Sequence, residues 1–173
     1  MAASAAVKIP MLNTIILSKV CFFIFLFYFF LACVFDLRYR AVPNMIHLIF
    51  ILTGFPLFLY HNIFTKTAFD ISLLNDLVIR FIPGLLLLFV SLVSRGALGI
   101  GDAVFMTISA LYINVRSVLF IFISGFLSAF VLSAVMLIYG KIKNKDLQHM
   151  SLPLIPLMLP GLYPILMNLN FNL

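Results

Sequence analysis

The sequence predicts an all-α integral membrane protein with about six transmembrane helices, the fourth of them short or tilted. Hydrophobic residues make up 65% of the chain and charged residues only 9%, whereas roughly a quarter of the residues in a soluble domain are charged. Apolar runs such as residues 20–35 are continuous, while the strands of a membrane β-barrel alternate between apolar and polar residues. At about 20 residues per span, the chain forms one membrane domain, residues 1–173, with short loops.

The apolar runs predict the elements in order. We expect the first to remain as a span, because it is too long for a signal peptide and no cleavage site follows it. Residues 61–76 have mixed polarity and predict a loop with a short surface-lying turn. The fourth run is apolar for only 11 residues, which suits a short, tilted or re-entrant segment. The expected spans are about 15–35, 44–60, 77–94, 103–113, 118–139 and 152–166.

The last expected span contains four prolines, which remove backbone donors and break regular helical bonding. A membrane tolerates such backbone only where protein or a wet cavity satisfies the freed groups. We therefore expect this segment to border the functional site. The prolines are Pro153, Pro156, Pro160 and Pro164.

The formal net charge is +6, but the cations lie mainly in loops between apolar runs. Such cations orient a membrane protein and contact anionic lipid, so the charge does not indicate nucleic-acid binding. In the expected topology six cations lie on the side of the candidate site, a slight bias toward a cytoplasmic site. These are Arg38, Arg40, Arg95, Lys141, Lys143 and Lys145, against Lys8, Lys19, Lys66, Arg80 and Arg116 on the other side.

Two aspartates lie where an apolar run meets a loop, and an ionisable residue in that place is a functional candidate by default. Asp36 ends the first run, and Asp102 follows the glycine-rich stretch Gly96-Ala97-Leu98-Gly99-Ile100-Gly101. Between the two aspartates the chain crosses the membrane twice, once in each direction, through the second and third expected spans. Both carboxylates are therefore expected on the same side, where they can meet.

Two facing carboxylates without metal ligands indicate aspartic-protease chemistry, in which the pair shares one proton. Helix dipoles alone predict that Asp36, at a C-terminal end, holds this proton and that Asp102, at an N-terminal end, activates water. Gly99 and Gly101 lack Cβ atoms, so an extended peptide can approach the backbone there. Each motif also has a structural alternative: Asp102 as a helix cap, and Asp36 paired with Arg40.

No other residues suggest a metal or a cofactor. Cys21 and Cys33 do not form a Cys-x-x-Cys pair, the spacing of a structural zinc site. The histidines also lack ligand spacing, and we expect each to be an interface or loop residue. They are His47, His61 and His149.

Together, the two aspartate motifs resemble those of the type IV prepilin peptidases, which belong to the Gly-x-Gly-Asp intramembrane aspartic proteases. Asp36 shortly precedes Pro43-Asn44 after the first long apolar run, and Gly99-Ile100-Gly101-Asp102 opens a later one. The stretch Leu152-Pro153-Leu154-Ile155-Pro156 is loosely similar to the family's last-helix motif.

The resemblance implies an aspartic endopeptidase in a prokaryotic cytoplasmic (inner) membrane. Such an enzyme cuts the basic leader from prepilin or pseudopilin precursors at the cytoplasmic face and needs no cofactor. The chain lacks the cysteine-containing insert of larger members, which argues against methyl transfer. We expect Asp36 and Asp102 to be the catalytic residues, and Gly99, Gly101, Pro43 and Asn44 to shape the site. We expect the substrate contacts to be Arg38, Arg40, Pro153 and Pro156.

Two alternatives remain open at this point. Buried aspartates beside a broken helix also suit a small ion- or proton-coupled transporter, in which Asp36 and Asp102 relay a cation. A structural membrane subunit would carry the same acids without using them. The sequence does not indicate the particular substrate or the oligomeric state.

Overall fold

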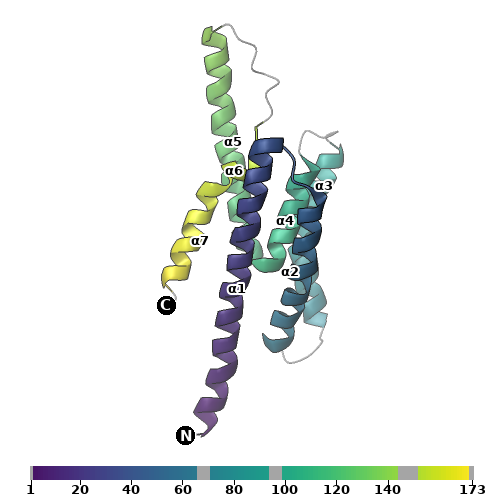
Figure 1. The fold of residues 1–173 in the computed structure, drawn as a ribbon, viewed down its shortest axis with the longest axis vertical. Coiled ribbons are helices and arrows are strands. Elements are labelled where there is room, and N and C mark those ends of the chain that lie inside the picture. Colours follow the sequence, from purple (N-terminus) through teal and green to yellow (C-terminus); the bar gives the residue numbers. More distant parts are fainter. Residues whose placement is uncertain (1, 66–70, 94–98, 144–151, 172–173) are drawn as a thin grey trace.

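The computed structural model describes residues 2–65, 71–93, 99–143 and 152–171, and within them the side chains of residues 16–62, 74–93, 99–143 and 152–167. All regular structure in these ranges is helical (Figure 1). The helices are α1 (Ala2–Tyr39), α2 (Asn44–Thr65), α3 (Ile71–Val93), α4 (Ile100–Tyr112), α5 (Val115–Lys143), α6 (Leu154–Leu157) and α7 (Leu159–Phe171). The prediction of an all-α membrane protein is confirmed.

Four of the described helices are long and apolar enough to cross a membrane: Ile16–Tyr39, Asn44–Asn62, Leu74–Val93 and Val115–Lys143. The fourth helix is short, as predicted. With 13 residues and a rise of 1.5 Å per residue, α4 measures about 20 Å, less than the roughly 30 Å of a bilayer's hydrocarbon core.

Two details differ from the sequence-based expectation. Residues 61–76 do not form a long loop, because α2 continues to Thr65 and α3 begins at Ile71. The last apolar segment is not one helix either: α6 ends at Leu157 and α7 begins at Leu159. Prolines explain the second difference, because Pro156 and Pro160 flank the break and neither has a backbone N–H to donate.

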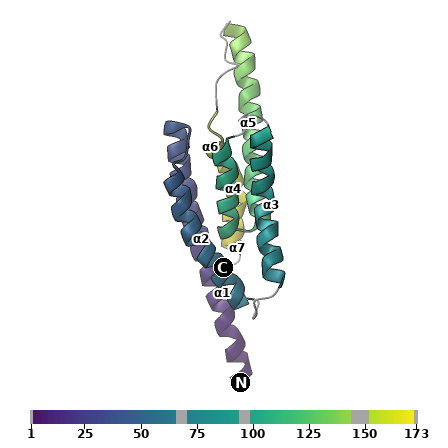
Figure 2. The same ribbon diagram turned by 90° about the vertical axis from the view of Figure 1, so that its right-hand side faces the viewer.

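Helix α4 is the centre of the bundle and contacts α1, α2, α3 and α5. Figure 2 shows it between the α1–α2 pair on one side and α3 and α5 on the other. Two glycines permit this close packing. A Cβ atom at Gly84 of α3 would collide with the side chain of Thr107, and one at Gly54 of α2 would lie 2.9 Å from the ring of Tyr112.

An aromatic cluster fixes α4 against the first two helices. The fully buried Tyr28 of α1 packs with its ring centroid 5.0 Å from that of Phe105 in α4 and 4.5 Å from that of Phe50 in α2. Phe105 lies three residues after Asp102, one helical turn further along. The cluster therefore holds the beginning of α4 at a defined place beside α1 and α2.

The other end of α4 is held by Arg80 of α3. Its Nη1 atom donates hydrogen bonds to the carbonyl oxygens of Ala110 at 2.7 Å and Ile113 at 3.3 Å. The guanidinium also lies 4.9 Å from the ring centroid of Phe58. The last carbonyls of a helix lack intrahelical partners, so this cation caps α4 at the end opposite Asp102.

Candidate active site

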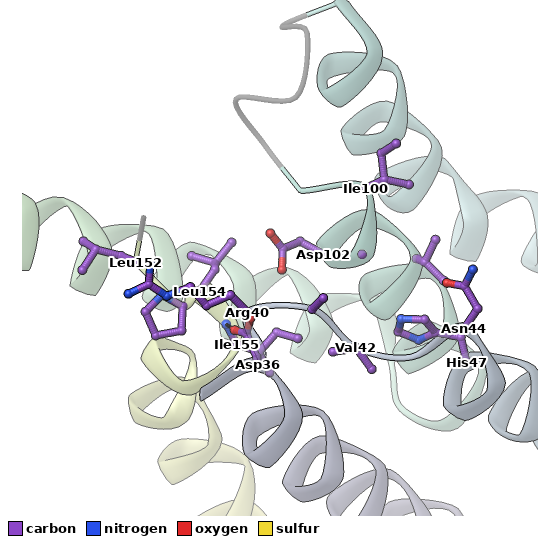
Figure 3. A pocket seen from close by; sticks show the side chains of 14 residues that line it. Asp36, Arg40, Val42, Asn44, His47, Ile100, Asp102, Leu152, Leu154 and Ile155 are labelled. Atoms are coloured by element: carbon purple, nitrogen blue, oxygen red, sulfur yellow. Dashed lines mark hydrogen bonds between the residues drawn. The ribbon is translucent and has the colours of Figure 1, made fainter. Parts of the chain in front are cut away.

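A cavity of about 350 Å³ opens where the end of α1, the beginning of α2, the beginning of α4 and the α6 segment meet (Figure 3). It contains both aspartates singled out in the sequence. Its lining residues are Asp36, Arg40, Ala41, Val42, Asn44, His47, Ile100, Gly101, Asp102, Val104, Leu152, Pro153, Leu154 and Ile155.

Asp36 belongs to the last turn of α1 and is buried, with 8% of its surface exposed. Its Oδ2 atom accepts a hydrogen bond from the backbone N–H of Ile155 at 3.1 Å. Ile155 lies in the first turn of α6, where a helix has backbone donors without intrahelical partners. The α6 segment therefore supplies a donor to a carboxylate on a helix 119 residues away in sequence.

Asp102 belongs to the first turn of α4, and its backbone N–H donates to the carbonyl oxygen of Gly99 at 3.1 Å. Gly99 caps this helix with an ordinary extended conformation, φ −65° and ψ 130°. Its lack of a side chain matters for space, since a Cβ atom there would lie 3.0 Å from Asp102 Oδ2. At Gly101 a Cβ atom would meet nothing within 4 Å, so the cavity is open there.

The two carboxylates come from α1 and α4 and line the same cavity. In Figure 3 the side chain of Asp102 reaches into the cavity from above, with Asp36, Arg40 and Ile155 along one side. The structure thus brings together the two acids that the topology placed on the same side.

The link between α1 and α2 bends sharply at Arg40, which has a positive φ of 52°. Residues other than glycine rarely adopt this left-handed conformation. Where it follows the end of a helix, the residue is usually glycine and sometimes asparagine. Arg40 N–H donates to the carbonyl oxygen of Asp36 at 2.9 Å, so the bend closes the last turn of α1. Strained backbone of this kind often lies at functional sites.

Six of the predicted site residues line the cavity and four do not. Arg38 is exposed, and its guanidinium lies 5.4 Å from the ring centroid of its neighbour Tyr39. Gly99 acts on the cavity indirectly, through Asp102. The lining residues are Asp36, Asp102, Gly101, Asn44, Arg40 and Pro153, whereas Gly99, Pro43, Arg38 and Pro156 are not among them.

The sequence reasoning missed His47. It was expected to be an interface or loop residue, but only 5% of its surface is exposed, and it lines the cavity with the aspartates. A signal was available, because His47 follows Asn44 by three residues and so lies on the same face of a helix. Among the described residues, no group of three His, Cys, Asp or Glu side chains is arranged to hold a metal ion.

The fold and the cavity define a multi-pass membrane protein with a polar site at one end of its helical bundle. A family model described as the type IV leader peptidase family matches residues 21–138, which include both aspartates. The chain belongs to this family and is a peptidase. No curated protein and no solved structure matches the chain.

Proposed function

We propose that the protein is an intramembrane aspartic endopeptidase that removes the basic leader from type IV prepilin or pseudopilin precursors. The observation that carries the proposal is the convergence of Asp36 and Asp102, from two helices, on one cavity. Membership of the leader peptidase family supports a peptidase and favours it over a transporter. The proposal includes a site at the cytoplasmic face of a prokaryotic inner membrane.

In the proposed reaction one carboxylate is ionised and the other carries the shared proton. The ionised group takes a proton from water, whose oxygen attacks the scissile carbonyl carbon while the other carboxyl donates its proton to the carbonyl oxygen. When the tetrahedral intermediate collapses, the C–N bond breaks, the leaving amine takes a proton from the first carboxyl, and a hydroxyl of the intermediate returns a proton to the second carboxylate, which restores the pair. The products are a free carboxyl end and a free amino end.

We assign the ionised role to Asp36, because Ile155 N–H donates to its carboxylate. A hydrogen bond to a charged group contributes about 1.5–3 kcal/mol, whereas a helix dipole contributes about 0.3–1 kcal/mol at an exposed end and up to about 2 kcal/mol at a partly buried one. We weigh the hydrogen bond above the dipoles, which reverses the assignment expected from the dipoles alone. Asp102 then holds the shared proton and polarises the scissile carbonyl.

The site side of the protein is basic, as are the leaders of such precursors, so charge attraction to the leader does not explain recognition. The apolar walls around Leu152, Leu154 and Ile100 suit the apolar helix that follows the cleavage site. Arg40 lines the same cavity, and we propose that it pairs with an acidic residue of the substrate.

The catalytic proposal is tested by co-expressing the protein with a candidate prepilin and measuring the size shift on cleavage. Asp36→Asn and Asp102→Asn should each lower the rate about a hundredfold to ten-thousandfold, the usual contribution of general acid–base catalysis. Equal amounts of each variant in the membrane fraction are the control. Full processing by either variant would reject the dyad, and uptake of an ion without cleavage would favour a transporter.

The Arg40 contact has its own test. Arg40→Asn removes the cation and keeps a residue that tolerates positive φ, so the bend is preserved. We expect the KM for the precursor to rise several-fold, consistent with loss of one partly exposed ion pair. Arg38→Asn is the matched control because Arg38 does not line the cavity. Equal effects of the two changes would remove this contact from the proposal.

A further inference from the structure

His47 has a buried nitrogen that nothing in the described structure satisfies. Its Nδ1 atom lies 2.8 Å from the hydroxyl oxygen of Tyr28, whereas Nε2 is buried without a hydrogen-bond partner among the described residues. Buried polar atoms in folded proteins nearly always have a partner, and an exception calls for an explanation. The position of the ring in the wall of the aspartate cavity provides one.

The contact with Tyr28 indicates which nitrogen carries the proton. Tyr28 is fully buried, and its hydroxyl needs an acceptor. If the hydroxyl donates to Nδ1, then Nε2 carries the ring hydrogen and is the single group left without a partner. If Nδ1 donates instead, both the tyrosine hydrogen and the Nε2 lone pair lack partners. The first arrangement leaves fewer groups unsatisfied, so Nε2 is a donor.

We propose that His47 is a substrate-binding residue whose Nε2–H donates a hydrogen bond to a backbone carbonyl of the bound peptide. The inference rests on the proposed peptidase function. In Figure 3, His47 and Asn44 lie at the side of the cavity away from Ile155 and Asp36. The carbonyl that His47 binds therefore belongs to a peptide residue near the scissile bond and not to the scissile bond itself. Nε2 is buried in the free protein, so the proposed contact requires the ring or the cavity wall beside it to move when the peptide binds.

A hydrogen bond made equally to bound substrate and transition state lowers KM and leaves kcat unchanged. Two substitutions separate this role from a structural one. Gln places an amide nitrogen near the position of Nε2, whereas Asn places its amide oxygen near Nδ1, where it accepts from the Tyr28 hydroxyl. His47→Gln therefore keeps a donor for the substrate, and His47→Asn keeps only the contact with Tyr28.

The experiment uses the purified full-length protein and a synthetic peptide that contains a basic leader and the beginning of an apolar helix. We expect His47→Asn to raise KM about tenfold, the cost of one lost hydrogen bond, with kcat within a few-fold of the parent protein. His47→Gln should stay close to the parent in KM. The reverse order, equal damage by both, or no effect of either would overturn the inference.

The tautomer can be measured without activity. In protein labelled with ¹⁵N-histidine, the signals absent from the His47→Asn spectrum belong to His47, and we expect them to report hydrogen on Nε2. Hydrogen on Nδ1 would overturn the inference. If the parent protein cleaves no prepilin-like peptide, the proposed function fails; if it cleaves and the His47 variants do not follow the expected order, only this inference fails.

Discussion

At the scale of single residues, the two glycines before Asp102 have different roles although the sequence motif treats them alike. Gly99 leaves room for the Asp102 carboxylate, while Gly101 leaves room in the cavity itself. The distinction depends on where a Cβ atom would point, which repeated glycines in a sequence do not reveal.

This difference can be measured with two matched substitutions. Gly99→Ala places a methyl group 3.0 Å from Asp102 Oδ2 and displaces the carboxylate. The carboxylate must give way by a few tenths of an ångström, and because a misplacement of about 1 Å can cost about a hundredfold in rate, we expect kcat to fall several-fold. Gly101→Ala should retain or raise thermal stability, since alanine favours a helix by up to about 1 kcal/mol, and should affect KM more than kcat. A larger loss of kcat at Gly101 than at Gly99 would contradict this account.

Residue type and position were sufficient to single out the aspartates but not the histidine. Asp36 and Asp102 are charges at the edge of apolar runs, and such placement carries information without any structure. His47 forms no ligand pattern with the other histidines. Its place beside the dyad follows from packing against Tyr28, a contact 19 residues away in sequence, and sequence spacing alone does not show such a contact.

At the scale of elements, the short α6 contributes a backbone donor to Asp36 as well as apolar side chains to the cavity wall. The prolines around it predicted broken helix bonding next to the functional site, and four residues of this segment do line the aspartate cavity: Leu152, Pro153, Leu154 and Ile155. Which of its donors meets which carboxylate could not be predicted, because the Ile155 N–H to Asp36 contact depends on how α6 packs against α1. The proton assignment that we propose depends on the same packing.

Two substitutions at Ile155 test the role of this backbone donor. Ile155→Ala keeps the N–H and loses a buried side chain, whereas Ile155→Pro loses both. We expect the proline variant to be at least about tenfold slower than the alanine variant, the value of a hydrogen bond to a charged group.

Isotope-edited infrared spectroscopy should find the shared proton mainly on Asp102 in the parent protein. A proton mainly on Asp36, or equal rates of the two variants, would reject the assignment.

At the scale of the whole molecule, the order of the helices determines which helix ends lie on the same side of the membrane as the aspartate cavity. Helices α1 and α5 both end on the side of the aspartate cavity, and α5 begins on the opposite side after Ile113 (Figure 1). In this arrangement α4 must carry the chain from the cavity side to the opposite side, although it is too short to cross a bilayer by itself. Sequence predicted the short helix but not its central position, which depends on the close approaches at Gly54 and Gly84.

The orientation can be determined with single cysteines and a membrane-impermeant thiol reagent. The native Cys21 and Cys33 are buried and should react slowly. For a cytoplasmic site, Arg38→Cys and Lys143→Cys should be protected in intact cells and labelled after permeabilisation, whereas Arg116→Cys should be labelled in both conditions. Labelling of Arg38→Cys from outside the cell would place the cavity on the outer face, and opposite behaviour of Arg38→Cys and Lys143→Cys would contradict the helix order.

The hydrogen bond between Ile155 and Asp36 forms only after both residues have been synthesised, so the cavity is completed late in the synthesis of the chain. Residues 21–138, which the family model matches, contain both aspartates but not Ile155, the partner of Asp36 in α6. During synthesis the acids enter the membrane well before the segment that aligns one of them. We therefore expect the chain to reach its full proteolytic rate only after α6 has been synthesised and has packed against α1.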